Sequence, residues 1–269
     1  MKRSRTKIAW TLVAATNSKE VLETNLLGSV EAESANELIL MQDPESASHA
    51  YNEALCRSSN EILVFAHQDV YLPRGWGVEL QEAISLLNRK DPDWGVAGVY
   101  GVTETGKGAG YVYSTGLRRF VGQCFSAPLQ VRTLDEMLLI VRRSSGLQFD
   151  EDLPGFHLYG TDICLEAQMR GMKNYVLPCF TLHNSNGVRH LPLSFWQAYL
   201  YLRKKWRKQL PIMTPCTKIT FACSPILRDF IRRRFLGILW RNNPGSRVND
   251  PERFYEEELG PVLESNKCY

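Results

Sequence analysis

A polar triplet, His67-Gln68-Asp69, directly follows the apolar run 61–66. The length and β-branched content of that run predict a buried strand. Open α/β sheets bind their ligands beside the carboxyl ends of the strands, which is where the triplet would lie. The triplet is therefore the first place in the chain to expect chemistry.

A second candidate group is the carboxylate of Asp162. The pattern after residue 160 predicts a helix that Thr161 caps, that an i,i+4 pair of Glu166 and Arg170 supports, and that ends at Gly171. Asp162 then lies in the first turn, where the helix dipole favours an anion and the preceding turn can direct it into a cleft. From the residues alone, Asp162 either caps the helix or acts as an active-site carboxylate.

Strands and helices alternate through the first hundred residues that must position these groups. The patterns predict strands at 7–16, 37–41, 61–66 and 95–99, and helices at 18–27, 46–55 (capped by Ser46 or Ser48) and 78–87. Such alternation is typical of an α/β fold with a mainly parallel sheet. The glycine-rich stretch 101–116 predicts a mobile loop that leads into a hairpin, and 129–141 predicts two further strands around Asp135-Glu136.

Composition limits the class of protein. The chain has 269 residues, 44% hydrophobic and 23% charged, which suits one large domain or one domain with an appendage. Its uncharged apolar runs are shorter than the ~20 residues of a membrane span, and we interpret the start as a first strand and not a signal peptide. Seven scattered cysteines without a CxxC pair predict neither a disulfide framework nor a zinc site. A reducing, cytoplasmic location fits best.

The net charge of +3 conceals a basic C-terminal segment, because eleven basic residues and one acid, Asp229, lie between Arg203 and Arg241. The stretches from Ser194 and around 226–240 predict amphipathic helices with basic faces. These helices either lie on the cytoplasmic face of an anionic membrane, attract phosphates of donor or acceptor, or pack on the sheet with a solvated face. No nucleic-acid motif is present, so we expect no nucleic acid.

Several motifs occur in an order that resembles the family 2-type glycosyltransferases of the GT-A fold. They are AATNS, LMQDPESASHAYNEAL, EILVFAHQDVYLPRGW, TLDEMLLIVRR, FDEDLPGFHLYGTDICLEA and LHNSNG. The similarity is strongest to the branch with HQD in place of DxD, and it covers roughly residues 7–190. It implies a Rossmann-like nucleotide-diphospho-sugar transferase fold in 1–190, followed by a basic, mainly helical extension in 191–269.

The resemblance also implies a metal site. Asp69 matches the last Asp of DxD, which binds a divalent cation that bridges the donor diphosphate, and His183 matches a second ligand. Carboxylate oxygens suit Mg²⁺ or Mn²⁺, and an imidazole suits Mn²⁺ better. His67 takes the place of the first Asp, which removes a carboxylate and leaves the metal requirement open. A hydrogen-bonded His67 and a lone surface His183 are the structural alternatives.

By the same comparison, Asp162 matches the catalytic base of an inverting, hexosyltransferase-type enzyme that takes the proton from an acceptor hydroxyl. Asp150, Glu151 and Asp152 are the alternative carboxylates, although a strand-end turn explains them as well.

Positions on the donor side follow from the same motifs: Thr16, Asp43, Asn52, Gln68 and Asp69. For Asp43, turn formation before Pro44 is a compatible explanation. On the acceptor side, Trp76, His157 and Tyr159 are weaker candidates, since aromatic residues are usually part of a core.

The sequence thus predicts a transferase of sugar from a nucleoside diphosphate donor, UDP favoured, to an unknown acceptor: a glycan, a lipid-linked molecule or a small molecule. The alternatives are a catalytically silent nucleotide-sugar-binding module, because the HQD motif is reduced, and a nucleotidyltransferase. The last would normally carry a glycine-rich basic signature after the first strand, which AATNSKE lacks.

Overall fold

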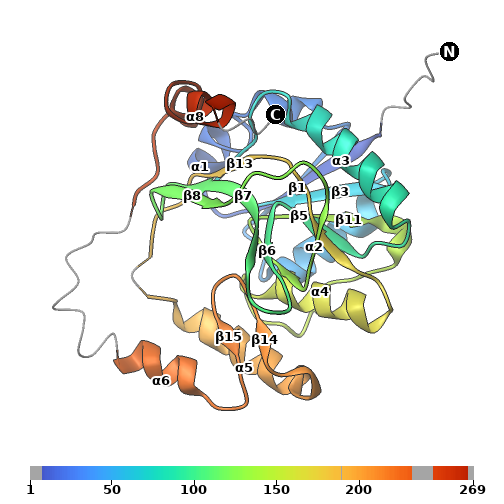
Figure 1. Cartoon of the computed structure of the whole chain (residues 1–269), viewed down its shortest axis with the longest axis vertical. Coiled ribbons are helices and arrows are strands. Elements are labelled where there is room, and N and C mark those ends of the chain that lie inside the picture. The colour runs from blue at the N-terminus through green and yellow to red at the C-terminus, as the bar shows by residue number, and fades with distance from the viewer. Residues whose placement is uncertain (1–7, 189, 232–244, 266–269) are drawn as a thin grey trace.

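The structure is a computed structural model that describes residues 8–188, 190–231 and 245–265. Figure 1 shows a body built around a central sheet, with a smaller group of elements, α5, α6, β14 and β15, below it. The last helices return to the body beside α1.

The central sheet has seven strands in the order β2-β1-β3-β11-β5-β12-β9. Their bounds are β1 Trp10–Thr16, β2 Glu37–Gln42, β3 Ile62–Ala66, β5 Val96–Gly98, β9 Leu129–Val131, β11 Leu138–Arg142 and β12 Asn174–Val176. β1 pairs in parallel with β2 and β3, and β12 with β5, whereas β11 and β9 run antiparallel to their neighbours. The expected sheet is present but is evenly mixed, because β11 enters between β3 and β5 in the opposite direction.

Helices cover both faces of this sheet. α1 (Lys19–Thr24) and α3 (Trp76–Lys90) share one hydrophobic cluster with it, and α2 (Ala47–Arg57), α4 (Tyr159–Met169) and α5 (Leu193–Lys205) share the other. Ser18 caps α1 by accepting from the Val21 amide, and Ser46 caps α2 by accepting from the His49 amide. The choice between Ser46 and Ser48 is thereby settled in favour of Ser46, and a short 3₁₀ helix at Val30–Ser34 follows α1.

The glycine-rich stretch forms strands of a second sheet, so the expected hairpin is present, and the expected loop is reduced to the connection 103–107. A second sheet has the order β10-β6-β7-β13-β4, and β8 pairs with β7. Its strands are β4 Val70–Tyr71, β6 Tyr100–Val102, β7 Gly108–Ser114, β8 Arg119–Gly122, β10 Thr133–Leu134 and β13 Thr181–His183. A Cβ at Gly122 would lie 1.9 Å from the carbonyl oxygen of Gly110, so the glycines permit a close approach of β7 and β8. Residues 129–141 contain three strands where we expected two.

The described residues of the C-terminal part are mainly helical and include a small hairpin. It contains α5, β14 Ile212–Met213, β15 Lys218–Ile219, α6 Ser224–Ile231, α7 Pro251–Phe254, a π-helical turn at Tyr255–Leu259 and α8 Gly260–Ser265. Residues of α5 belong to the same hydrophobic cluster as the sheet, and Leu259 and Leu263 pack with Tyr71 and Leu182. The division at residue 190 stays a prediction, since packing is continuous across it.

Most cysteines among the described residues are free. Cys124 is disulfide-bonded, contrary to the expectation of no disulfide framework, whereas Cys56, Cys164, Cys179, Cys216 and Cys223 are free.

Within the residues described, no helix combines the length and the apolar character needed to cross a membrane.

Candidate functional site

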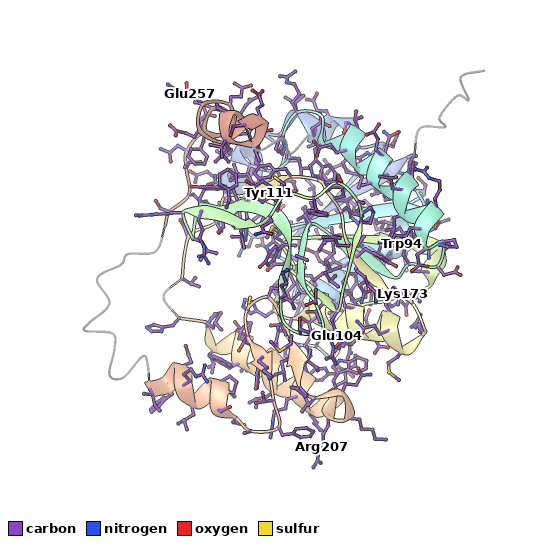
Figure 2. All side chains as sticks on the ribbon, in the orientation of Figure 1. Trp94, Glu104, Tyr111, Lys173, Arg207 and Glu257 are labelled. Carbon is purple, nitrogen blue, oxygen red and sulfur yellow. The ribbon has the colours of Figure 1, made fainter. Side chains whose placement is uncertain are left out.

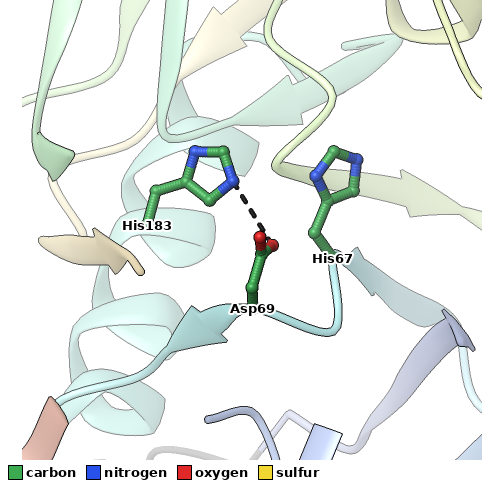
Figure 3. A group of neighbouring side chains, drawn as sticks. All are labelled: His67, Asp69 and His183. Atoms are coloured by element: carbon green, nitrogen blue, oxygen red, sulfur yellow. Dashed lines mark ion pairs between the residues drawn. The ribbon is translucent and has the colours of Figure 1, made fainter. Parts of the chain in front are cut away.

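The partly buried side chains of His67, Asp69 and His183 lie together (Figure 3). His67 and Asp69 occupy the turn between β3 and β4, and His183 ends β13, which pairs antiparallel with β4 so that His183 is opposite Val70. One potential ligand atom from each residue lies within 4.8 Å of the others, and His183 Nε2 is 3.3 Å from Asp69 Oδ1. Two strands far apart in the sequence thus bring together the residues that the sequence motifs suggested as metal ligands.

The electrostatics of this cluster keep Asp69 ionised. Burial by itself would raise the pKa of the Asp69 carboxyl, but the neighbouring His183, His67 and Arg247 together hold that pKa well below its usual range. The pKa of His183 is raised, because the attraction of Asp69 outweighs the effect of burial. Burial lowers the pKa of His67. A carboxylate that stays anionic beside an imidazole is a suitable pair of donors for a cation.

Arg247, which the sequence analysis missed, also reaches Asp69. Its Nη2 lies 3.1 Å from Asp69 Oδ2, and its Nε donates to the carbonyl of Asn184 at 3.0 Å. The Asn184 side chain holds the same segment in place, because it accepts from the Val248 amide at 2.8 Å and donates to the Val248 carbonyl at 2.9 Å. No local pattern marks Arg247, since 178 residues separate it from Asp69.

The donor set fits a divalent cation of the Mn²⁺ or Mg²⁺ kind. Asp69 offers a carboxylate oxygen and His183 an imidazole nitrogen, and such ions complete their coordination with water and phosphate oxygens. His67 Nε2 instead forms a hydrogen bond of 2.9 Å with the hydroxyl of Tyr159. His67 thus forms the hydrogen bond of the structural alternative, whereas His183, paired with Asp69, is not a lone surface histidine.

Gln68 joins the triplet to the end of β1. Its Oε1 accepts from Thr16 Oγ1 at 2.6 Å and from the Ser18 amide at 3.1 Å. Asp43, exposed at the end of β2 with a φ of 45°, donates its amide to the Thr16 carbonyl at 2.8 Å. Three of the predicted donor-side residues, Thr16, Asp43 and Gln68, thus meet at the carboxyl ends of the parallel strands.

Asn52 has a different environment. Its side chain accepts from the Phe149 amide at 2.8 Å and donates to the Phe149 carbonyl at 2.9 Å and to Glu151 at 3.0 Å. These bonds tie α2 to the loop before α4. Asn52 therefore has a structural role in the present arrangement, and its use toward a donor stays a prediction.

The Asp162 carboxylate is covered by the end of α5. The side chain is 1% exposed; its Oδ1 accepts from Trp206 Nε1 at 2.6 Å, and its Oδ2 lies 2.9 Å from Lys205 Nζ. Burial raises the pKa of Asp162, and Lys205 opposes that shift. Trp206 and Lys205 thus occupy both oxygens of the carboxylate and separate it from solvent.

Lys205 serves three carboxylates at once. Besides Asp162, it lies 2.7 Å from Asp150 Oδ2 and 3.0 Å from Glu166 Oε1. Glu166 therefore pairs with Lys205 and not with Arg170 as predicted, while Arg170 donates to the Gly146 carbonyl. Neither Lys205 nor Trp206 was predicted for the site, although both lie in the basic segment that the charge count singled out.

The start of α4 differs from the prediction. The helix begins at Tyr159, after Leu158 in the left-handed region, and Thr161 Oγ1 is buried without a hydrogen-bond partner. The Glu136 carboxylate accepts from the backbone amides of Leu158 and Gly160 and so replaces the expected local cap. Asp162 nevertheless lies in the first turn, and Gly171, with a φ of 80°, follows the end of the helix as predicted.

Two predicted acceptor-side aromatics are core residues. Trp76 is 1% exposed, packs against Trp10 with ring centroids 5.8 Å apart and donates to Thr181 Oγ1. Tyr159 is equally buried, and its hydroxyl bonds His67. Neither ring is available to stack on a sugar as the structure stands. His157 is partly exposed, with its ring centroid 5.6 Å from that of Phe195, and stays a candidate.

Comparison with known protein families identifies the family of this chain. Residues 19–191 match the glycosyltransferase like family, a span of well over half of the chain. The chain belongs to this family. The matched span of this glycosyltransferase-like protein contains Asp69, Asp162 and His183, and excludes Lys205 and Arg247.

One curated relative of this glycosyltransferase-like protein is the ATP synthase subunits region ORF 6 of Fuscovulum blasticum. It is 34% identical over 171 residues, which cover 60% of this chain and 66% of that protein. The chain thus spans slightly less than two thirds of the relative's length. The name of the relative describes a gene region and assigns no activity.

Solved structures show the fold. A crystal structure of GalNAc-T7 with UDP, GalNAc and Mn²⁺ resembles the chain with a TM-score of 0.54 and 13% identity, over 96% of this chain and 58% of that one. The mannosyltransferase PcManGT from Pyrobaculum calidifontis, in complex with GDP-Man and Mn²⁺, has a TM-score of 0.47 and 14% identity, over 86% and 71% of the two chains. The expected mixed α/β fold of the GT-A glycosyltransferases is confirmed by the first of these likenesses.

Proposed function

We propose that this protein transfers a sugar from a nucleoside diphosphate sugar, UDP favoured, to an acceptor hydroxyl with inversion. The observation that carries the proposal is the cluster of His67, Asp69 and His183 beside the carboxyl ends of β1, β2 and β3. Membership of the glycosyltransferase-like family supports the reaction class, and the neighbour bound to UDP and Mn²⁺ supports the donor and metal classes.

Asp69 and His183 would hold the divalent cation, which when bound stabilises negative charge on the departing diphosphate. The chain's own residues act around it: Arg247, 3.1 Å from Asp69, brings a fixed positive charge to the same place. The hydrogen bond between Thr16 and Gln68 joins the end of β1 to the turn that carries Asp69. Asp43 is joined to Thr16 as well, so one hydrogen-bonded framework would hold a nucleoside near Asp43 and a diphosphate near Asp69.

Asp162 would act as the general base that takes the proton from the acceptor hydroxyl. Burial already raises its pKa, which favours proton acceptance once the group is exposed to the acceptor. Its approach is closed by Trp206 and Lys205, so the reaction requires the end of α5 to move. Such a movement couples acceptor entry to the C-terminal segment.

A second function has a specific observation in its favour. Lys205 and Trp206 engage both oxygens of the Asp162 carboxylate. A catalytically silent module that only binds a nucleotide sugar would have the same arrangement. The two functions differ in turnover and not in binding. The acceptor, a glycan, a lipid-linked molecule or a small molecule, stays a prediction. The cytoplasmic location stays a prediction as well.

The test starts with binding. Thermal shift against UDP, GDP, CDP and ADP, each with and without Mn²⁺, is expected to give metal-dependent stabilisation by one nucleotide, UDP first. The sugar donors of that nucleotide are then assayed for release of free nucleoside diphosphate, with Asp162→Asn as the matched variant. Indifference to all four nucleotides overturns both functions. Binding without turnover in either protein supports the silent module.

A further inference from the structure

Helix α6 has two different faces. Ile226 packs against the main hydrophobic cluster and Asp229 is partly buried, which places one side of the helix toward the body. Leu227, Phe230 and Ile231 lie at positions i, i+3 and i+4 of the opposite side and are 59%, 62% and 43% exposed. Three large apolar side chains of this eight-residue helix therefore point away from the body.

Phe221, three residues before α6, is a further large apolar side chain that is 59% exposed. Arg203 on α5 donates its Nε to the carbonyls of Thr220 and Phe221, each at 3.1 Å, and so fixes the backbone that carries the phenyl ring. We call Phe221, Leu227, Phe230 and Ile231 the α6 apolar face. Its members sit on an anchored backbone and not on a loose end.

Charge around the face has one sign. Asp229, the single acid of the basic segment, is turned inward, where its carboxylate accepts from Trp196 Nε1 at 3.2 Å and lies 4.0 Å from His190 Nδ1. Arg228 in the same helix is exposed, as are Lys218, Lys204, Arg207 and Lys208 in the neighbouring elements. Arg232, Arg233 and Arg234 follow in the sequence and lie outside the described residues. The acid is thus turned inward, while the described cations of these elements are exposed.

We propose that the α6 apolar face lies in the surface of an anionic lipid bilayer. An interfacial helix needs large apolar side chains on one side and basic residues near it, and α6 has both, while its one acid, Asp229, is turned inward. The lipid headgroups supply the complementary charge, and the exposed phenyl and aliphatic groups enter the headgroup boundary. Figure 1 shows α6 at the lower end of the molecule, remote from α3, so a membrane there leaves the body free.

Anionic lipid is favoured over a packed protein partner by the charge pattern. Figure 2 shows side chains of α6 and Arg207 extending outward from the lower group of elements. A protein partner would have to bury many unpaired cations, whereas a lipid surface neutralises them without a fixed geometry. The proposal does not depend on the transfer reaction, because it concerns only where the protein is held.

The test is flotation of the full chain with vesicles of phosphatidylcholine, with and without phosphatidylglycerol. The wild-type protein is expected to float with the anionic vesicles only, and raised salt is expected to release part of it. The double variant Leu227→Glu/Phe230→Glu should lower the bound fraction at least about tenfold. Phe221→Ser, outside the helix, gives a second reading that does not threaten helix formation.

Val78→Glu is the matched control, because Val78 is 62% exposed on α3, a helix that Figure 1 shows in the upper part of the molecule, away from α6. It should bind anionic vesicles as the wild type does. Equal flotation of the double variant, equal binding to phosphatidylcholine alone, or no binding at all overturns the proposal. Self-association in sedimentation that the double variant abolishes, without vesicle binding, would assign the face to a second copy of the chain and also overturn it.

Discussion

The Lys205 ammonium lies 2.9 Å from the Asp162 carboxylate, although 43 residues separate them. Burial lowers the pKa of Lys205, but Asp162, Asp150 and Glu166 outweigh that effect and raise the pKa above its usual range. The lysine is therefore held as a cation among three acids. Through it, the end of α5 controls access to the group that we propose as catalytic base.

Asp162→Asn should leave a folded protein that binds the donor nucleotide but transfers sugar about 10²- to 10⁴-fold more slowly, because general-base assistance is lost. Transfer rate and nucleotide affinity are measured side by side. Asp152→Asn, an exposed neighbour in the loop before α4, is the control and should keep its rate. Near-normal turnover of the Asp162 variant would remove the base assignment.

Asp69→Asn should weaken Mn²⁺ binding at least about tenfold, since even an outer partner of a metal ligand is typically worth that much. Titration calorimetry with Mn²⁺ alone measures this effect independently of turnover. Asp93→Asn, an exposed aspartate after α3, should bind as the wild type does. The same affinity in both variants would place the metal elsewhere.

Lys205→Met should lower the free energy of unfolding by about 1–3 kcal/mol, because three carboxylates lose their shared cation in a partly buried place. The lysine side chain is 22% exposed, so water screens part of the loss. Urea unfolding measures the difference. Lys204→Met, at the exposed adjacent position, is expected to cost little; equal losses in the two variants would deny Lys205 a special role.

The raised pKa of Glu79 on α3 predicts that the stability of the fold depends on pH. Burial, with help from Glu31 and Glu82, raises its pKa from about 4.5 to about 7, although the Phe180 backbone opposes the shift. The folded state therefore binds the proton more tightly, so stability present below pH ~4.5 is lost as the pH rises through ~7. Glu79→Gln should match the wild type near pH 4 and be more stable by about 1–3 kcal/mol at pH 8.

Chemical unfolding at the two pH values measures that crossover. Glu45→Gln, at an exposed position before α2, is the control and should shift neither curve. A constant difference between Glu79→Gln and the wild type at both pH values would mean that the proton on Glu79 is not the cause.

Local patterns were sufficient for several individual helices and strands. The caps Ser18 and Ser46, the strand before His67 and the stop at Gly171 were all predictable, because each depends on residues a few positions apart. Motif order also identified Asp69 and His183, which β4 and β13 bring together. The hairpin in 101–116 was predicted, but most of the expected loop there is strand, since glycine content does not reveal whether a partner strand will approach closely.

The sequence by itself determined which residue types stand at the ends of the strands, since strand period and turn chemistry are local. Only the tertiary structure decided that Glu136 caps α4, that Lys205 and Trp206 cover Asp162, and that Arg247 reaches Asp69. Those contacts join residues tens to hundreds of positions apart. Their formation depends on how the whole chain packs, because burial and charge compensation are properties of neighbours in space and not of neighbours in sequence.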